Sequence, residues 1–496
     1  MHVVYQPNVC RVVGNITAEE RQVLDAALNF EHPNPTAQQL NNPYWDQKVN
    51  FWLDSYKTQF PTGLWPHVWN MLHSHGQTNV HVECGIGQAT STVEVDPHVF
   101  QSAGIELRDY QIDLANKAIA GNRGVISAPP RSGKTLIQAA IAATLDKKTV
   151  IFVQRQSLLK QHYNTLKSLG LDVGLVQGQT REFDKKICIA MLQTVWSGQR
   201  SAEMMQWLNS VEVMLIDECH HSGSGDTFYR AGLLCPASWR LGFSGTPYSI
   251  TDLEEQRFSE DHWKLAGLLG PQLGDISLAS LQDKGLLVKV NVVQVKQEED
   301  PEIQCLDGHV WHPVYKAGVV ENKARNQCIQ DLALDMVGKG YFPLILINQV
   351  KHGEALFKSL SRAGLRPIFA RGGSKVLTAS GMMQGSINDA YELVLSGGGN
   401  LLIATQIGDE GVDLPKVDGL ILAVGGKADK VNVQRAFRPL TSAEGKTRAV
   451  VVDFDDRQHG VLRRQSAARR KIYKSLGFEP KLATMNQALD LIPANV

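Results

Sequence analysis

The sequence contains no hydrophobic run that approaches the roughly 18 consecutive apolar residues a membrane-spanning helix requires. Its first residues, MHVVYQPNVCRVVG, also lack the basic region and long apolar core of a secretory signal. We therefore expect a protein without a membrane segment. The expected location is the cytoplasm, which for a viral protein would be the host cytoplasm.

Cysteine is scarce and follows no pairing pattern. Seven cysteines are scattered over 496 residues, and none forms a C-x-x-C pair. Such a set is typical of free thiols in a reducing compartment. The adjacent Cys219, His220 and His221 suggest zinc, but no second ligand pair occurs at a suitable spacing, so we favour free thiols.

The chain has no net charge, because 50 Lys and Arg balance 50 Asp and Glu. Residues 1–100 nevertheless carry four basic and nine acidic residues, a balance of −5, which leaves +5 for residues 101–496. Residues 457–474 contain seven Lys and Arg and no acid, which is typical of either a solvated helix face or a phosphate-binding face. The residues that we expect to contact DNA there are Arg463, Arg464, Arg470 and Lys471.

A chain of this length predicts several domains. From residue 104 onward, short β-branched runs alternate with longer helical stretches, and the pattern occurs twice, which predicts two tandem α/β domains with doubly wound parallel sheets. The first set of strands is expected at 124–127, 149–153, 186–190, 212–217 and 240–244. The second set is expected at 343–348, 366–370, 400–405, 419–424 and 448–454.

The first hundred residues predict a separate small α+β domain. VNFWLDS alternates like a strand, and a Pro-Thr-Gly turn precedes a helix whose apolar face includes Leu64, Val68 and Leu72 and which stops at Gly76. Four of the nine tryptophans lie here. They favour either a small aromatic core or a surface that contacts bases.

The segment APPRSGKT at 128–135 predicts a nucleotide-binding loop between a strand and a helix. Backbone N–H groups and the helix N-terminus would point toward phosphates, Lys134 would reach the β and γ phosphates, and the Thr135 hydroxyl would hold Mg²⁺. Ala128 replaces the first glycine of the usual pattern, but the strand and helix on either side support the assignment. The expected ATP-binding residues of this loop are Pro130, Arg131, Ser132, Gly133, Lys134 and Thr135.

An acidic motif, DECH at 217–220, follows another expected strand. Asp217 would hold the metal through a carboxylate oxygen, and Glu218 would orient and deprotonate the attacking water. Together with the phosphate loop, this motif predicts ATP hydrolysis that depends on Mg²⁺.

Three further motifs are weak when taken singly. Arg108 and Gln111 of LRDYQ precede the phosphate loop, and a glutamine amide offers a donor and an acceptor that suit the edge of adenine. SGTP at 244–247 follows a strand and could be a plain turn. Arg435 and Arg438 of QRAFRPL could be surface residues, or they could stabilise charge on a γ-phosphate.

In this order the motifs resemble those of superfamily 2 helicases and translocases. LRDYQ is similar to the adenine-reading motif, APPRSGKT to motif I, FVQRQSLLKQ to motif Ia, DECH to motif II, SGTP to motif III, ATQIGDEGVD to motif V and QRAFR to motif VI. The resemblance covers about residues 104–456. It implies two RecA-like domains with ATP in the cleft between them and a nucleic-acid strand across their tops.

The resemblance also implies roles for individual residues. Motif VI departs from the usual Q-x-x-G-R-x-x-R, because Phe437 replaces glycine and Thr441 replaces the last arginine, so the catalytic arginine could be Arg438, which we favour, or Arg435. Gly411 and Asp413 would bind the nucleotide. The residues implied to couple nucleotide state to the strand are His220, Ser244, Thr246 and Gln434. The residues implied to contact strand phosphates are Arg155, Gln193, Thr194 and Thr405.

Within the first hundred residues, NPYWDQKVNFWLDSYKTQFPTGLWPHVWNMLHSHG resembles the N-terminal domain of phage UvsW-type helicases, which remodel branched DNA. In that family the domain helps to engage duplex DNA. We therefore expect an accessory DNA-binding domain at 1–100, an ATP-binding RecA-like domain at 101–253, a connection at 254–300, and a second RecA-like domain with a basic C-terminal helix at 301–496.

Taken together, these features predict an ATP-dependent DNA helicase or translocase that unwinds or branch-migrates forked and junction DNA in replication, recombination or repair. We expect a monomer that uses ATP and Mg²⁺ and binds DNA with little sequence specificity, because phosphate contacts carry no base information. Two alternatives stay open. One is an RNA helicase or a restriction-type duplex translocase, and the other is a non-hydrolysing, ATP-gated DNA clamp.

Overall fold

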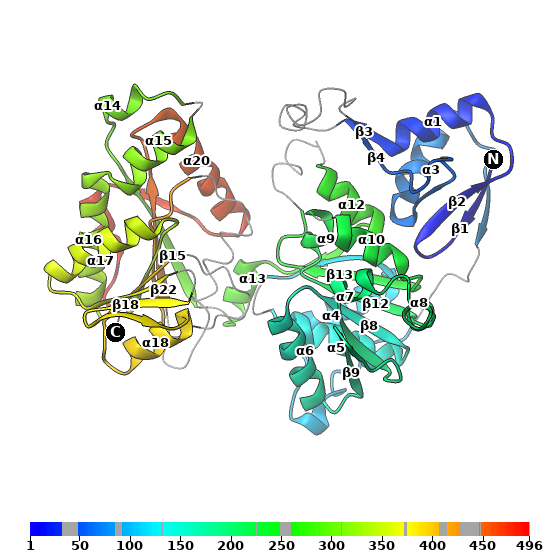
Figure 1. The fold of residues 1–496 in the computed structure, drawn as a ribbon, viewed down its shortest axis with the longest axis horizontal. Helices are drawn as coiled ribbons and strands as arrows, with labels where there is room; N and C mark the ends of the chain where they lie inside the picture. The colour runs from blue at the N-terminus through cyan, green and yellow to red at the C-terminus, as the bar shows by residue number, and fades with distance from the viewer. Residues whose placement is uncertain are drawn as a thin grey trace. The chain divides into compact units, whose positions relative to one another are not determined.

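The structure is a computed structural model, and the chain divides into a first unit, Met1–Ile276, and a second unit, Ser277–Val496. Each unit contains its own sheet with helices packed against it (Figure 1). The residues that the structure describes are 1–31, 48–84, 92–129, 132–224, 226–248, 259–286, 288–308, 310–371, 374–405, 414–426, 446 and 448–495.

The N-terminal part of the first unit is a small α+β fold. Its main sheet has the strand order β5–β2–β1–β6, and a short β3–β4 ribbon lies beside it. Helix α1 begins with a capping box between Thr17 and Glu20, and α3 is followed by Gly76, whose φ of +75° suits glycine. The elements are β1 (His2–Tyr5), β2 (Val9–Val13), α1 (Ala18–Leu28), β3 (Asn29–Glu31), β4 (Lys48–Asn50), β5 (Gln59–Pro61), η1 (Thr62–Leu64), α3 (Trp65–Ser74), β6 (His81–Cys84) and η2 (Gln101–Ala103).

The strand expected at VNFWLDS is mostly absent. Strand β4 ends at Asn50, and the next two residues, Phe51 and Trp52, are both buried instead of alternating between core and solvent. The Trp52 indole N–H donates to Asp25 at 2.9 Å. Trp52 therefore belongs to a small aromatic core, which is one of the two roles predicted for the tryptophans.

The larger part of the first unit is an eight-stranded sheet in the order β10–β9–β11–β8–β12–β13–β7–β14, parallel except for β10. The five strands predicted from β-branched runs are all present. The strands are β7 (Arg123–Ser127), β8 (Thr149–Val153), β9 (Val173–Gln177), β10 (Thr180–Arg181), β11 (Ile187–Met191), β12 (Val213–Asp217), β13 (Trp239–Ser244) and β14 (Gln272–Asp275). The helices are α4 (Asp109–Gly121), α5 (Lys134–Leu145), α6 (Gln156–Ser168), α7 (Leu192–Ser197), α8 (Ala202–Asn209), α9 (His220–Ser224), α10 (Asp226–Leu234) and α12 (Glu260–Leu269).

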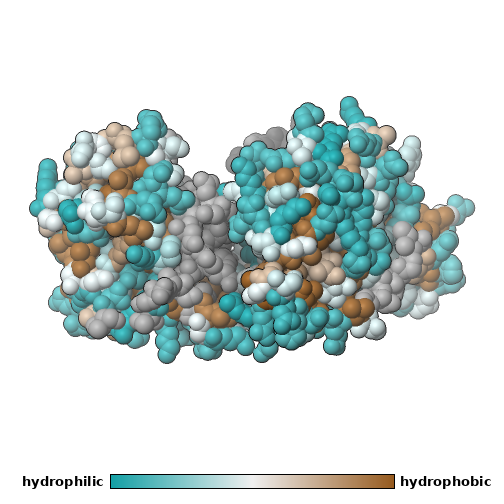
Figure 2. All heavy atoms as spheres, turned by 90° about the horizontal axis from the view of Figure 1, so that it is seen from below, coloured by the Kyte–Doolittle hydropathy of each residue, from teal (hydrophilic) through white to brown (hydrophobic). Residues whose placement is uncertain are grey.

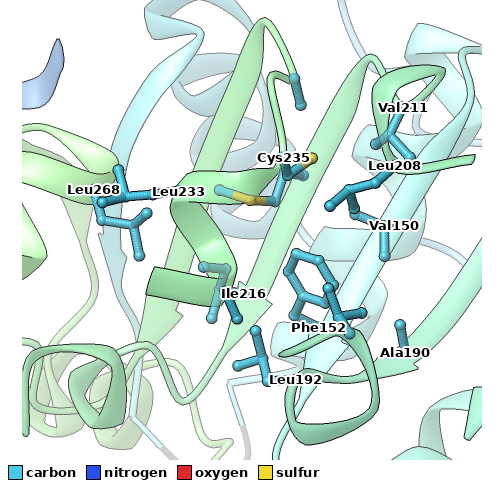
Figure 3. Packing of buried hydrophobic residues seen from close by; sticks show 14 of the residues in the cluster. Val150, Phe152, Ala190, Leu192, Leu208, Val211, Ile216, Leu233, Cys235 and Leu268 are labelled. Carbon is cyan, nitrogen blue, oxygen red and sulfur yellow. The ribbon is translucent and has the colours of Figure 1, made fainter. Parts of the chain in front are cut away.

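A continuous apolar cluster holds helices to this sheet. Figure 3 shows Phe152 of β8 and Ile216 of β12 packed close to Leu192 of α7, and all three are fully buried. Burying a side chain of this size contributes roughly 1.5–3 kcal/mol. This packing fixes the carboxyl ends of β8 and β12, where the predicted motif residues begin.

The second unit is a nine-stranded sheet in the order β19–β18–β17–β20–β16–β21–β22–β15–β23, parallel except at β18 and β19. The strands are β15 (Lys289–Lys296), β16 (Pro343–Leu346), β17 (Pro367–Arg371), β18 (Lys375–Thr378), β19 (Gly381–Gln384), β20 (Leu401–Ala404), β21 (Gly419–Leu422), β22 (Arg448–Asp455) and β23 (Lys481–Ala483). The helices are α13 (Leu278–Asp283), α14 (Pro301–Gln304), α15 (Trp311–Tyr315), η3 (Lys316–Val320), α16 (Lys323–Gly338), α17 (Val350–Arg362), α18 (Ile387–Leu395), α20 (Gly460–Ser475) and α21 (Met485–Leu491).

The stretch 254–300, expected to be a connection, contributes to both units. Strand β14 pairs with β7 in the first sheet, and β15 pairs with β22 in the second. The division between units falls after Ile276. The described residues of this stretch therefore include strands of both sheets and do not form a separate linker.

The surface is mixed in character. On the face drawn in Figure 2, hydrophobic residues are scattered among hydrophilic ones. Among the described residues, no helix is both long enough and apolar enough to cross a membrane.

Candidate active site

The parallel sheet of the first unit brings the predicted motifs to one edge. The phosphate loop follows β7, Asp217 ends β12 and Ser244 ends β13. The register pairs Ser244 with Ser127 and Asp217 with Phe243, so these strand ends are neighbours. The carboxyl edge of a parallel sheet is where open α/β folds bind ligands.

The phosphate loop ends in a glycine that no other residue could replace without strain. Gly133 caps α5 with φ +78°, and a Cβ there would lie 2.2 Å from the Gln111 amide nitrogen. Lys134 and Thr135 follow in the first turn of α5, where backbone N–H groups favour anions.

The loop is held from behind by helix α4. The Tyr110 hydroxyl donates to the Ser132 carbonyl at 2.8 Å, and the Gln111 amide donates to the same oxygen at 3.1 Å. The amide oxygen of Gln111 accepts a hydrogen bond from the Arg108 backbone N–H at 3.0 Å. Gln111 is only 2% exposed, so its amide supports the loop in this structure, whereas the sequence predicted that it would read adenine.

Lys134 and Glu218 form an ion pair at the mouth of the loop. Lys134 Nζ lies 2.9 Å from Glu218 Oε1, and the two side chains are 11% and 10% exposed. Glu218 has φ +47°, a conformation that costs a non-glycine residue about 1–2 kcal/mol. Such strain is found where surrounding structure holds a residue for function.

The Asp217 carboxylate is bracketed by two buried side chains. Gln138 Nε2 donates to Oδ1 at 3.0 Å, and His162 Nε2 lies 3.7 Å from Oδ2. The opposite ring nitrogen of His162 donates to the Leu158 carbonyl at 3.0 Å, because a carbonyl can only accept. Burial raises the pKa of Asp217, and the neighbouring His162 partly offsets that rise.

The donor set fits magnesium. Asp217 and Thr135 supply a carboxylate and a hydroxyl oxygen, and Mg²⁺ usually binds one or two such groups together with substrate phosphates and water. Within the described ranges no cluster of three or more His, Cys, Asp or Glu side chains could hold a metal by itself. A metal ion bound at this edge would therefore need ligands from phosphate and water in addition to the described side chains.

The acidic motif contacts the SGTP motif directly. His220 Nδ1 lies 2.8 Å from Ser244 Oγ and 3.5 Å from Glu218 Oε2. The Thr246 backbone N–H donates to Ser244 Oγ at 3.0 Å. The structure thus brings together His220, Ser244 and Thr246, which the resemblance implied to act as a coupling group.

Three residues predicted to contact a strand lie along the same edge. Arg155 precedes α6, after β8, while Gln193 and Thr194 open α7, after β11. Gln193 Nε2 donates to the Gln154 carbonyl at 3.1 Å, and Gln154 Nε2 lies 3.5 Å from the Glu218 carbonyl. The Thr194 hydroxyl accepts from the Gly178 backbone N–H at 3.1 Å. Gln154 therefore connects this group to the acidic motif.

In the second unit, Thr405 follows β20 at the carboxyl edge of that sheet, and its N–H donates to the Ala370 carbonyl at 3.4 Å. The remaining predicted residues lie outside the described residues. These are Pro130, Arg131, Gly411, Asp413, Gln434, Arg435 and Arg438.

The basic C-terminal segment is helix α20, and its basic residues fall into two classes. Arg469 is 1% exposed and pairs with Asp453 and Asp456, and Arg470 pairs with Asp455 at 2.8 Å. Arg470 is therefore a poor candidate for DNA contact, because its partner Asp455 is buried, whereas the 3.9 Å pair of Arg463 with Glu299 is exposed. The basic side chains on the exposed face of α20 are Arg463, Arg464, Lys471 and Lys474.

Sequence reasoning missed four residues of the site: Tyr110, Gln138, Gln154 and His162. Tyr110 and Gln154 lie within recognised motifs, and Gln138 and His162 lie in helices that follow such motifs, but each has a partner 22 to 79 residues away in the chain. Helical periodicity marks Tyr110, Gln138 and His162 only as inward-facing, and Gln154 lies in the loop between β8 and α6. The clearest signal is a polar side chain on the buried face of an otherwise apolar helix, as with Gln138 in α5.

Part of the first unit matches a known protein family. Residues 104–249 match the family model described as type III restriction enzyme, res subunit. The solved fragment of a Vibrio vulnificus protein named as an HsdR subunit of a type I restriction enzyme gives a TM-score of 0.54 at 14% identity, covering 85% of this chain and 75% of that one. This second likeness concerns the fold alone. The chain resembles superfamily 2 helicases and has their two tandem RecA-like units.

Among individual proteins, the chain is similar to the ATP-dependent DNA helicase UvsW of Enterobacteria phage T4. The two are 22% identical over 393 residues, which cover 75% of this chain and 73% of UvsW. A Haloarcula marismortui protein named as the DNA 3′-5′ helicase Rad25 is 25% identical over 363 residues, which cover 70% of this chain and 52% of that protein. The chain spans between about half and two thirds of the length of some curated helicase relatives.

Proposed function

We propose that the chain is an ATP-dependent DNA helicase or translocase that unwinds or branch-migrates forked and junction DNA. One observation carries the proposal: Lys134 of the phosphate loop contacts Glu218, directly beside the buried Asp217. A loop lysine, a metal-holding aspartate and a water-orienting carboxylate are the groups that nucleotide hydrolysis requires.

The ion pair supports a stepwise role for Lys134. A γ-phosphate competes with Glu218 for the lysine, because a phosphate offers more negative charge and more acceptor oxygens than a carboxylate. When Lys134 turns to the phosphate, Glu218 is released to accept a proton from the attacking water. Mg²⁺ held by Thr135 and Asp217 would neutralise the charge on the phosphates.

The contacts around Glu218 support coupling to a strand. His220 links the acidic motif to Ser244, and Gln154 links the Glu218 backbone to Gln193. A shift of Glu218 during hydrolysis would therefore reach residues expected to hold strand phosphates. Repeated cycles would convert hydrolysis into movement along the strand.

The names of the relatives support DNA as the partner, since UvsW is named an ATP-dependent DNA helicase and the Haloarcula protein a DNA 3′-5′ helicase. By this analogy we propose movement from 3′ to 5′. The match of residues 104–249 to a restriction-enzyme subunit favours a duplex translocase as the second candidate.

A comparison of nucleic acids in two assays tests the proposal. ATP hydrolysis and strand separation are measured with forked DNA, a four-way junction, linear duplex, single-stranded DNA and RNA of matched length. The proposal predicts the strongest stimulation and separation with forks and junctions. Strongest stimulation by linear duplex without separation would favour the duplex translocase, and strongest stimulation by RNA would reject both.

A further inference from the structure

The second unit contains a cavity at the carboxyl ends of β16 and β21, and none of its lining residues has been assigned a role above. Its volume is about 480 Å³, within the range of small-molecule sites. The side chains that line it are aromatic or amide-bearing, with no Lys, Arg, Asp or Glu among the described lining residues. The lining is Trp311, His312, Tyr315, Asn348, Gln349, Gly425, Gly426 and Gln465.

Trp311 forms an open flat wall of this cavity. It is 39% exposed, although tryptophan is a large apolar side chain, and its ring centroid lies 5.2 Å from that of Tyr315. Tyr315 is buried, and its hydroxyl donates to the Val424 carbonyl at 2.7 Å. Tyr315 therefore packs against the Trp311 ring and supports it, while one part of the indole stays accessible.

Gly426 keeps the cavity open opposite Trp311. Gly425 and Gly426 follow β21 with φ +56° and +82°, a region that L side chains rarely adopt. A Cβ at Gly426 would lie 3.2 Å from the Trp311 ring and would fill the space in front of it. A side chain at Gly426 would therefore narrow the cavity, whereas a Cβ at Gly425 would meet Val319 at 2.8 Å.

The cavity wall contains an amide oxygen, that of Gln465, which accepts no hydrogen bond from any described residue. Gln465 Oε1 is buried, and it lies about 4 Å from the Cβ position of Gly426. A buried polar atom without a partner is unfavourable, so a hydrogen-bond donor supplied by a ligand would be favoured. Asn348 and Gln349 place further amides beside it.

We propose that this cavity binds a nucleobase, which stacks on Trp311 and donates a hydrogen bond to Gln465. A flat ring with donors and acceptors on its edge matches an aromatic wall and amides, whereas a phosphate would need cationic partners that the described lining lacks. The inference rests on the proposed function in one respect, because the base is taken to belong to a bound nucleic-acid strand. A free nucleotide has the same base chemistry, and the experiment separates the two sources.

The test measures equilibrium binding by fluorescence anisotropy. A labelled single-stranded DNA and the same strand made of abasic sugars are bound to the wild-type protein and to Trp311→Ala, Trp311→Phe and Gln465→Leu. Val310→Ala is the matched control, since Val310 is an exposed neighbour, 50% accessible, that does not line the cavity. Thermal unfolding checks that each variant is folded.

Trp311→Ala is expected to weaken binding of the base-bearing strand by about 5- to 150-fold, which corresponds to removing one base–aromatic stack worth about 1–3 kcal/mol. Binding of the abasic strand should not change, Trp311→Phe should fall between wild type and Trp311→Ala, and Val310→Ala should match wild type. Gln465→Leu should weaken the base-bearing strand alone. The inference would be overturned if Trp311→Ala bound each of the two strands as tightly as wild type does. If DNA still stimulated hydrolysis in that case, the proposed function would stay intact.

A second arm uses thymidine monophosphate as a competitor. If it binds in a Trp311-dependent way and DNA neither binds nor stimulates hydrolysis, the cavity takes a base from a free nucleotide and the proposed function fails. If neither thymidine monophosphate nor DNA shows any dependence on Trp311, the nucleobase site itself is rejected.

Discussion

One buried ion pair, between Lys134 and Glu218, joins two motifs that lie on different strands of the first unit. Its position explains why Glu218 tolerates φ +47°. The Glu218 carbonyl accepts from the His221 N–H at 3.2 Å, and the next residue, Cys219, donates its N–H to Phe243 at 3.0 Å. These bonds hold a strained backbone in place, so the carboxylate points to the loop.

His162 is predicted to position the Asp217 carboxylate. Replacing His162 with Ala should raise the Mg²⁺ concentration for half-maximal ATP hydrolysis by about 10-fold or more, because groups that orient a metal ligand typically contribute that much. His162→Asn, which keeps a polar side chain, should have a smaller effect. Magnesium titrations at saturating ATP check this, and an unchanged Mg²⁺ requirement in His162→Ala would mean that the ring only fills space.

Arg438 is predicted to be the catalytic arginine. Arg438→Ala should lower the turnover of ATP by about 10³-fold or more while nucleotide affinity changes little, because such an arginine acts on charge in the transition state. Arg435→Ala is the matched comparison. If steady-state hydrolysis falls only in Arg435→Ala, the role belongs to that residue.

At the level of single elements, helix α20 could be predicted from the sequence, but the burial of individual residues in it could not. The cluster of basic residues predicted a helix with a basic face, and the helix is present. The sequence could not distinguish Arg469, which is buried against Asp453, from its exposed neighbours. The acids that pair with it come from strand β22 and the residue that follows it, and such pairing between elements leaves no local trace.

The exposed face of α20 is predicted to contact DNA phosphates. Changing Arg463, Arg464 and Lys471 together to Gln should flatten the plot of log binding constant against log salt concentration by about 0.7 to 0.9 for each phosphate that the protein no longer neutralises. Lys351→Gln with Lys358→Gln on α17 is the control. A slope equal to that of wild type would identify the α20 face as merely solvated.

At the scale of the whole chain, the strands with β-branched runs and the order of the motifs could be predicted, because both are local properties. Strand β14, with the sequence QLGD, could not, since it forms only by pairing with β7. The placement of Gln138 and His162 beside Asp217 could not be predicted from the sequence either. It requires helices α5 and α6 to pack on the sheet in one particular register.

The second unit is predicted to lose stability in mild acid through His352. This side chain is fully buried, its Nε2 lies 2.8 Å from Asn326 Oδ1, and burial together with the nearby Arg325 lowers the pKa of His352 to about 3. Between pH 6.5 and about 3 the unfolded chain binds a proton that the folded chain does not. Stability should therefore fall as the pH drops, by up to about 1.4 kcal/mol per pH unit.

Urea unfolding at several pH values between about 5 and 7.5 checks this. His352→Gln should show a weaker dependence on pH than wild type, and His312→Gln, which replaces an exposed histidine, should not. A wild-type stability that rises as the pH falls over this range would contradict the assignment.

Glu218 is predicted to activate water for ATP hydrolysis that DNA stimulates. Steady-state hydrolysis is measured for the wild type and for Glu218→Gln, each with and without forked DNA. DNA should stimulate the wild type, and the turnover of Glu218→Gln should fall by at least about 10²-fold while ATP still binds. Equal, slow hydrolysis by both proteins, unaffected by DNA, would mean that Glu218 does not activate water and would favour an ATP-gated clamp.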